Sequence, residues 1–322
     1  MLSKKIVATL LAAGAACALQ AQAQGYPNKP VRIIIGYATG GAADAGLRPL
    51  ARVLETALGQ PIIIEYKPGA AGGVAAEFLS KATPDGYTLY FVDSGPLTIA
   101  PHMAKVGYNA LNSFTHLGQV CSTGSMMVVH PATPFHSVAD VVAASKREPN
   151  KWSYGTSGVG GPHHLSGEYF KSVTGAVLLH VPYKGGGPAM TDLMGGQVPI
   201  LFSSLGPAVG AVKGGKIRAL AVTSLTRAGA FPDVPTMNEV GLKGFESTAW
   251  FGVMGPAGLA PEVSARLSQA LLKSGEDKTL QDQLNATGCD AQFLNPAQTV
   301  EKIKSDSTKW GRVVREAKIT ID

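Results

Sequence analysis

The sequence predicts an α/β fold in which two doubly wound units, each built on a parallel sheet, are joined by two crossings of the chain. Short apolar runs alternate with segments whose apolar residues recur at helical spacing, which is typical of strand–helix–strand units. Four of these runs end in loops rich in glycine. In open α/β sheets, ligands bind at the carboxyl ends of strands, so these loops are the candidate site.

The composition is that of a globular protein of 322 residues, long enough for two domains. Apolar residues make up 45% of the chain and charged residues 16%, which excludes a disordered chain. The formal charge is +6, but no run of lysine and arginine is long enough for a nucleic-acid patch. No nucleic-acid partner is therefore expected.

The N-terminus has the three regions of a secretory signal peptide. Lys4 and Lys5 precede an apolar region over residues 6–19, and small residues at 21–23 form a cleavage site. We expect cleavage after Ala23, export to the periplasm, and no membrane-spanning segment in the mature chain. Gly14 stands where lipid attachment at Cys17 would favour a branched apolar residue, so a lipoprotein is not expected.

Two cysteines remain in the mature chain, Cys121 and Cys289. A disulfide between them is possible in an exported protein, but their spacing does not require one, so their pairing stays open. Two thiols are too few for a cysteine-built zinc site.

The first unit is predicted from three strand–loop–helix segments. An apolar strand from residue 31 runs into the loop 38–41, and then Leu47, Leu50 and Leu54 recur at helical spacing. A strand over 61–66 and a glycine turn precede a helix over 74–81. A third strand, 87–92, ends in the loop 93–96.

The second unit repeats this pattern. Its elements are listed here: strands over 126–130, 152–156, 177–181, 199–203 and 218–223, and helices over 138–146, 165–173 and 189–194. A strand over 250–254 and helices over 262–274, 278–286 and 296–318 follow, which indicates that the chain returns to the first unit. We place the crossings near Ser125 and Thr226. Domain 1 is then residues 24–125 with 226–322, and domain 2 is residues 126–225, with a hinge and a cleft between them.

The candidate ligand-binding residues lie on the strand-end loops and at the following helix starts. These segments offer free backbone N–H groups and hydroxyls but only one formal cation, Lys184, which suits a carboxylate better than a polyphosphate. The side chain of Asp44 either contacts the ligand or only favours the dipole of its helix. The predicted ligand-binding residues are Tyr37, Ala38, Thr39, Gly40, Gly41, Asp44, Ser94, Gly95, Thr156, Ser157, Gly158, His164, Tyr183, Lys184, Gly185 and Ser203.

Motifs for nucleotides, catalysis and metals fail on inspection. The glycines before Lys216 have Walker spacing, but Ile217 stands where a hydroxyl residue would hold magnesium. Ser157 lacks the final glycine of a nucleophile elbow. Adjacent His163 and His164 face different sides of a helix and lack metal spacing. We expect no catalytic residue, no cofactor and no metal.

Taken in order, short motifs along nearly the whole mature chain follow one family pattern. They include Lys-Pro-Gly-Ala from residue 67, Pro-Asp-Gly-Tyr-Thr-Leu from 84, Val-Pro-Tyr-Lys-Gly from 181 and Gly-Gly-Gln-Val from 195. The chain resembles the substrate-binding proteins of tripartite tricarboxylate transporters, the Bug-type periplasmic receptors. The resemblance implies a type II periplasmic-binding-protein fold and a small organic acid, a carboxylate or dicarboxylate, held between two domains. We also expect a monomer whose ligand-bound form docks on membrane permease subunits.

Two departures from the family pattern bear on the ligand. Residues 36–39 read Gly-Tyr-Ala-Thr where relatives usually have proline and phenylalanine. Tyr37 is therefore expected to give the pocket an aromatic wall, and an aromatic acid stays among the options. Pro199 stands where an aspartate often follows Gly-Gly-Gln-Val. Two alternative functions remain: a sensory input to a receptor kinase, and an exported hydrolase using Ser157 with His163 or His164.

Overall fold

The first half of the chain folds around a parallel sheet in the computed structural model, which describes residues 25–319 except 38 and 40. Strands β1 (Val31–Ile35), β2 (Ile62–Tyr66) and β3 (Thr88–Asp93) pair in parallel with β1 in the middle. The three isoleucines of β1 are fully buried, which explains why this segment is apolar without alternation.

Helices connect these strands and cover the sheet. They are α2 (Ala42–Leu58), the 3-10 turn η1 (Ala70–Gly72), α3 (Gly73–Ser80), and the short α4 (Gly95–Thr98) and α5 (Ala100–Met103). Helix α2 is followed by Gly59, whose φ of 71° is in the left-handed region that glycine adopts at low cost.

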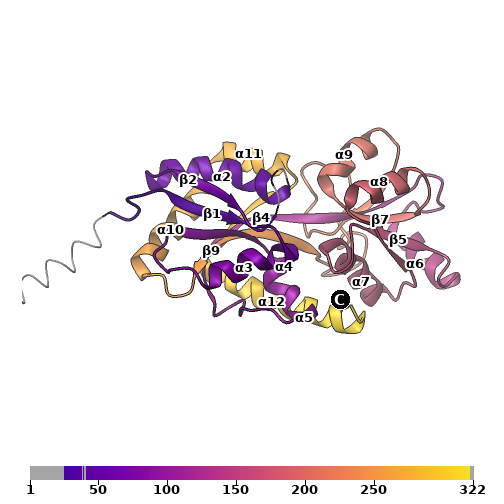
Figure 1. Cartoon of the computed structure of the whole chain (residues 1–322). Coiled ribbons are helices and arrows are strands. Elements are labelled where there is room, and N and C mark those ends of the chain that lie inside the picture. Colours follow the sequence, from indigo (N-terminus) through magenta and orange to yellow (C-terminus); the bar gives the residue numbers. More distant parts are fainter. Residues whose placement is uncertain (1–24, 38, 40, 320–322) are drawn as a thin grey trace, which may run out of the picture.

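One long strand, β4 (Phe114–Val129), links the two halves of the molecule (Figure 1). Its first part pairs antiparallel with β9 (Thr248–Pro256), and its last part pairs antiparallel with β7 (Ile200–Ser204) and β8 (Arg218–Val222). The resulting sheet has the order β2-β1-β3-β9-β4-β7-β5-β6. The two units therefore share a continuous mixed sheet instead of having purely parallel sheets.

The second half repeats the strand–helix pattern. It contains α6 (Val138–Arg147), β5 (Ser153–Thr156), α7 (Pro162–Thr174), β6 (Leu179–Pro182), α8 (Gly186–Met194) and α9 (Leu205–Lys213). Strand β5 pairs in parallel with both β6 and β7, so the loops that follow these three strands lie at one edge of the sheet. Helix α6 begins at the capping box of Ser137 and Asp140, as Ser137 in the sequence predicts.

The C-terminal segment returns to the first half and then reaches the second. Helices α10 (Pro261–Ser274) and α11 (Lys278–Ala286) and strand β10 (Asp290–Leu294) pack with the first sheet. Helix α12 (Pro296–Glu316) buries Ile303 in a first-half cluster and Trp310 in a second-half cluster, and Figure 1 shows it extending beneath both halves. Among the described residues, no helix is long and apolar enough to cross a membrane.

Cys121 and Cys289 form a disulfide, which settles the pairing that the sequence leaves open. The bond joins β4 to the segment just before β10, and both cysteines are buried. It closes a loop over 168 residues of sequence, and this loop contains the entire second half.

Thr223 ties together the strands that cross between the halves. Its hydroxyl accepts a hydrogen bond from Ser125 N at 2.8 Å and lies 2.6 Å from Ser247 O. After this residue, Phe231 packs in a second-half cluster with β7 and α9, and Phe245 packs with α7 and β5. The chain returns to the first half at β9, which begins at Thr248.

Two strands differ from the sequence predictions for a physical reason. The predicted strand at 126–130 covers only the end of β4. The first part of β4 was not predicted because polar residues and glycines, among them Gly118 with a φ of 151°, interrupt its run of apolar residues. Strand β10 was not predicted, since none of its residues is fully buried and Gln292 is exposed.

Candidate ligand-binding site

A cavity of about 480 Å³ lies between the two halves. From the first half it is lined by residues of the loop after β1, of α3, of the end of β3 and of α5, and from the second half by the loop before α7. Tyr37 and Gly95, both predicted site residues, line it. The other main lining residues are Val74, Glu77, Asp93, Ile99, Met103, Lys105, Tyr108, Gly160, Gly161 and Pro162.

Asp93, the most buried acid of this lining, is not among the residues predicted from the sequence, although Ser94 and Gly95 are. Its Oδ1 accepts a hydrogen bond from Gly95 N at 2.7 Å, and its Oδ2 accepts one from the Tyr37 hydroxyl. Burial raises the pKa of the Asp93 carboxyl to about 6, while these two hydrogen bonds oppose the rise. Burial and the neighbouring Asp93 raise the pKa of the Tyr108 hydroxyl to about 12. The sequence offers one signal for this site residue: Asp93 is a charged residue directly after the predicted apolar strand over 87–92.

Asp44 is buried in the first turn of α2, where three polar side chains surround it. It accepts hydrogen bonds from Arg48 Nε at 3.0 Å, from the Tyr66 hydroxyl at 2.6 Å and from Thr39 Oγ1 at 3.3 Å. It does not line the cavity described above. This network holds the first turn of α2 against β2 and the β1 loop.

In the second half, a pair of stacked imidazoles supports the loop that borders the cavity. The rings of His164 and His180 lie 3.8 Å apart and nearly parallel. His164 Nδ1 accepts a hydrogen bond from Gly160 N at 3.0 Å, which requires that this nitrogen carry no proton. Thr156 Oγ1 lies 2.6 Å from His180 Nε2, and neither Thr156 nor His164 lines the cavity.

Ser157 and His163, the pair that the hydrolase alternative would use, lie close together. Ser157 Oγ lies 2.7 Å from His163 Nδ1, and the other ring nitrogen meets Ser204 Oγ at 3.1 Å where a catalytic triad would place a carboxylate. Burial lowers the pKa of His163 to about 4, far from the near-neutral value that suits a general base. The two hydrogen-bond contacts of the His163 ring join Ser157, in the loop after β5, to Ser204 at the end of β7.

The remaining predicted residues lie at or after strand ends in the two halves without lining this cavity. Ser94 and Ser203 are buried, while Gly41, Lys184 and much of the loop after β6 are exposed. These remaining residues are Gly41, Ser94, Gly158, Tyr183, Lys184, Gly185 and Ser203. Ala38 and Gly40 lie outside the described residues.

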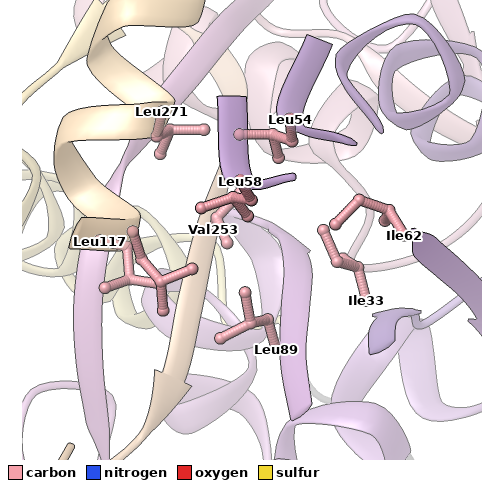
Figure 2. A pocket seen from close by; sticks show the side chains of 9 residues that line it. Ile33, Leu54, Leu58, Ile62, Leu89, Leu117, Val253 and Leu271 are labelled. Carbon is pink, nitrogen blue, oxygen red and sulfur yellow. The ribbon is translucent and has the colours of Figure 1, made fainter. Parts of the chain in front are cut away.

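A second hollow lies inside the core of the first half (Figure 2). Its volume is about 10 Å³, and its lining is wholly apolar, including Ile33, Leu89 and Leu271. A space this small holds at most one water, and this one offers that water no polar partner, so it is a packing gap. Among the described residues, no group of three or more acidic, histidine or cysteine side chains could hold a metal ion.

Comparison of the sequence and the fold with known proteins finds a family of receptors. Residues 47–319 match the tripartite tricarboxylate transporter family receptor. Protein BugT of Bordetella pertussis is 32% identical over 306 residues, which cover 94% of each chain. The solved structure of the periplasmic binding protein BugD is 31% identical with a TM-score of 0.74, over 92% of this chain and 99% of that one.

Two similar structures contain small dicarboxylic acids. Rpa4515 of R. palustris with adipate is 28% identical with a TM-score of 0.77, over 92% of this chain and 99% of that chain. MatC of Rhodopseudomonas palustris with bound malate is 26% identical with a TM-score of 0.73, over 90% of this chain and 100% of that chain.

Proposed function

Because the chain belongs to the tripartite tricarboxylate transporter receptor family, we propose that it is a periplasmic receptor that captures a small organic acid for uptake by membrane permease subunits. The observation that carries this proposal is the cavity of about 480 Å³ bounded by both halves, a size that suits a small molecule. The comparisons give no support to the sensory and hydrolytic alternatives. We further propose that the protein acts as a monomer and a binder without catalysis.

The backbone and hydroxyl groups at the strand ends would hold the carboxylate. Gly161 is the N-cap of helix α7 and borders the cavity, so the helix dipole and the free N–H groups that follow Pro162 in the first turn favour an anion there. Hydrogen bonds between neutral donors and a carboxylate are roughly twice as strong as bonds between neutral groups. A site of this kind needs no arginine or metal ion to bind an acid.

We also propose that residues 1–23 are a signal peptide removed after Ala23, and that closure occurs about two crossing segments. The first crossing is β4 near Ser125. Residues such as Phe231 and Phe245 pack with the second half, which favours a second crossing near Ser247 over the position near Thr226 expected from the sequence. The Thr223 hydroxyl contacts both crossing segments, so it is placed to hold the hinge together.

The carboxylate assignment is tested with an organic acid and its methyl ester. The acid is first identified by native mass spectrometry of protein purified from its own periplasm. In titration calorimetry, the ester should bind at least tenfold more weakly than the acid, because it lacks the charge that the backbone donors stabilise. Equal affinity for the two compounds would contradict the assignment.

A pair of substitutions tests whether backbone groups or the lysine dominate binding. Gly161 lines the cavity and has a φ of −78°, which any residue adopts, and a Cβ added there meets open space, so valine blocks the approach to the backbone without straining it. Gly161→Val should weaken acid binding by roughly 2–4 kcal/mol, the scale of one or two charged hydrogen bonds. Lys184 is exposed, and Lys184→Met should cost only about 1 kcal/mol. The opposite order of losses would overturn the backbone mechanism.

A further inference from the structure

Asp93 brings a negative charge into a cavity where an organic acid is expected to bind. The other charged side chains among the described lining residues are Glu77 and Lys105, so acids outnumber bases two to one. Glu77 forms an ion pair with Lys81 at 2.7 Å on the exposed face of α3. Asp93 instead lies partly buried at the end of β3, where it accepts a hydrogen bond from the Tyr37 hydroxyl, and Tyr37 and Tyr108 also line the cavity.

The contacts of Asp93 leave it able to bind a further donor. An ionised carboxylate offers about four lone-pair positions. Within the described residues, Gly95 N and the Tyr37 hydroxyl occupy one position on each oxygen. These two contacts fix the orientation of the carboxyl group, and the remaining positions stay open to a ligand.

The charge of Asp93 decides which ligand group can approach it. With a pKa of about 6, the carboxyl is mostly ionised at pH 7 and mostly protonated at pH 5. A second carboxylate brought near it would be repelled, since two like charges in a poorly hydrated site do not both ionise at low cost. An ammonium group would instead form a charge-assisted hydrogen bond with it.

We propose that Asp93 is a specificity-determining residue that selects a zwitterionic organic acid, whose ammonium group binds Asp93 while its carboxylate binds the strand-end loops. The proposal rests on the proposed receptor function and narrows its ligand class. A zwitterionic ligand would differ from adipate and malate, the dicarboxylic acids in the two similar structures. The apolar lining from Ile99 and Met103 suits a carbon chain between the two charged ends.

The test compares acids that differ only in the group at the far end. Hexanoate, 6-aminohexanoate and adipate share a six-carbon backbone, and matched series of four to eight carbons cover other lengths. In titration calorimetry at pH 7, the amino acid of the best-fitting length should bind at least tenfold more tightly than the matching diacid and monoacid. Asp93→Asn should remove this preference, whereas Glu301→Gln, a control at an exposed acid outside the cavity, should keep it within threefold.

A pH series on the unaltered protein supplies a readout that does not depend on a variant. Tyr37, Tyr90 and Tyr108 are the titratable side chains that face Asp93, and Glu77 and Lys105 are the other charged groups of the cavity. Between pH 7 and pH 5, affinity for the amino acid should fall roughly tenfold as Asp93 takes up a proton. The Asp93→Asn variant should show no such fall.

Several outcomes would overturn the assignment of Asp93. Tighter binding of a diacid or monoacid would do so, as would an equal loss of affinity for all three compounds in Asp93→Asn, which indicates a structural role. If no member of the series binds, the acid recovered by native mass spectrometry decides: an acid without an ammonium group refutes the role of Asp93 but leaves the receptor function intact. Failure to bind any organic acid would refute both.

Discussion

Replacing both Cys121 and Cys289 with alanine is expected to lower the free energy of unfolding by roughly 3–5 kcal/mol. The disulfide closes a loop spanning 168 residues, so its loss returns a large amount of chain entropy to the unfolded state. Both side chains are buried, and alanine fits their sites without adding polar atoms. This effect is a large share of the 5–15 kcal/mol that typically separates folded and unfolded proteins.

Urea unfolding of the oxidised protein and of the double variant measures this difference. The matched control is a reducing agent, which should destabilise the unaltered protein by a similar amount and leave the variant unchanged. A difference under about 1 kcal/mol would mean that the disulfide constrains the unfolded chain far less than its loop length implies. An oxidising compartment such as the periplasm preserves the bond.

Acidification from pH 7 to pH 4 is expected to remove roughly 3–6 kcal/mol of stability through His163 and His180. Burial lowers the pKa of both imidazoles to about 4, against about 6.5 in the unfolded chain. Their stabilising contribution is therefore complete above pH 6.5 and is lost as the pH falls toward 4, because the unfolded state binds the protons first. For His180, the nearby His164 and Lys171 add to the effect of burial, and Glu168 opposes it.

Asp93 acts in the opposite direction over nearly the same range. Its pKa is raised to about 6 from about 4, so its contribution to stability is present below pH 4 and is lost as the pH rises through 6. The two effects are separated by comparing the unaltered protein with a His163→Gln, His180→Gln variant, since both retain Asp93. The difference in unfolding free energy between them should shrink by roughly 3–6 kcal/mol between pH 7 and pH 4.

A control at an exposed histidine checks that burial causes this pH dependence. His136 is exposed, and His136→Gln should reproduce the pH profile of the unaltered protein. If the double variant does not fold, each single variant should show about half of the effect. A pH profile that the buried substitutions do not alter would assign the acid sensitivity to other groups.

The sequence by itself determined the class of fold, the order of most strands and helices, and the family. It could do so because buried strands such as β1 are continuously apolar, helices such as α2 repeat apolar residues at helical spacing, and the family motifs lie at loop positions that glycine and proline fix locally. Of the predicted ligand-binding residues, Tyr37 and Gly95 line the cavity between the halves.

Only the tertiary structure decided which side chains meet. Whether Cys121 and Cys289 pair depends on the distance between strands far apart in sequence, and their Cα atoms lie 5.5 Å apart only after β4 and the C-terminal segment have packed together. In the sequence, Asp93 looks like any acid at the end of a strand, and only the fold brings it to Tyr37 and the cavity. Nothing in the sequence marks His180 as a partner of His164, and only the fold stacks the two rings. The spacing of apolar residues indicates which face of a helix or strand is buried. The hydrogen-bond partners of a side chain, the charges around it and its pKa depend on neighbours in the folded structure, which no local pattern encodes.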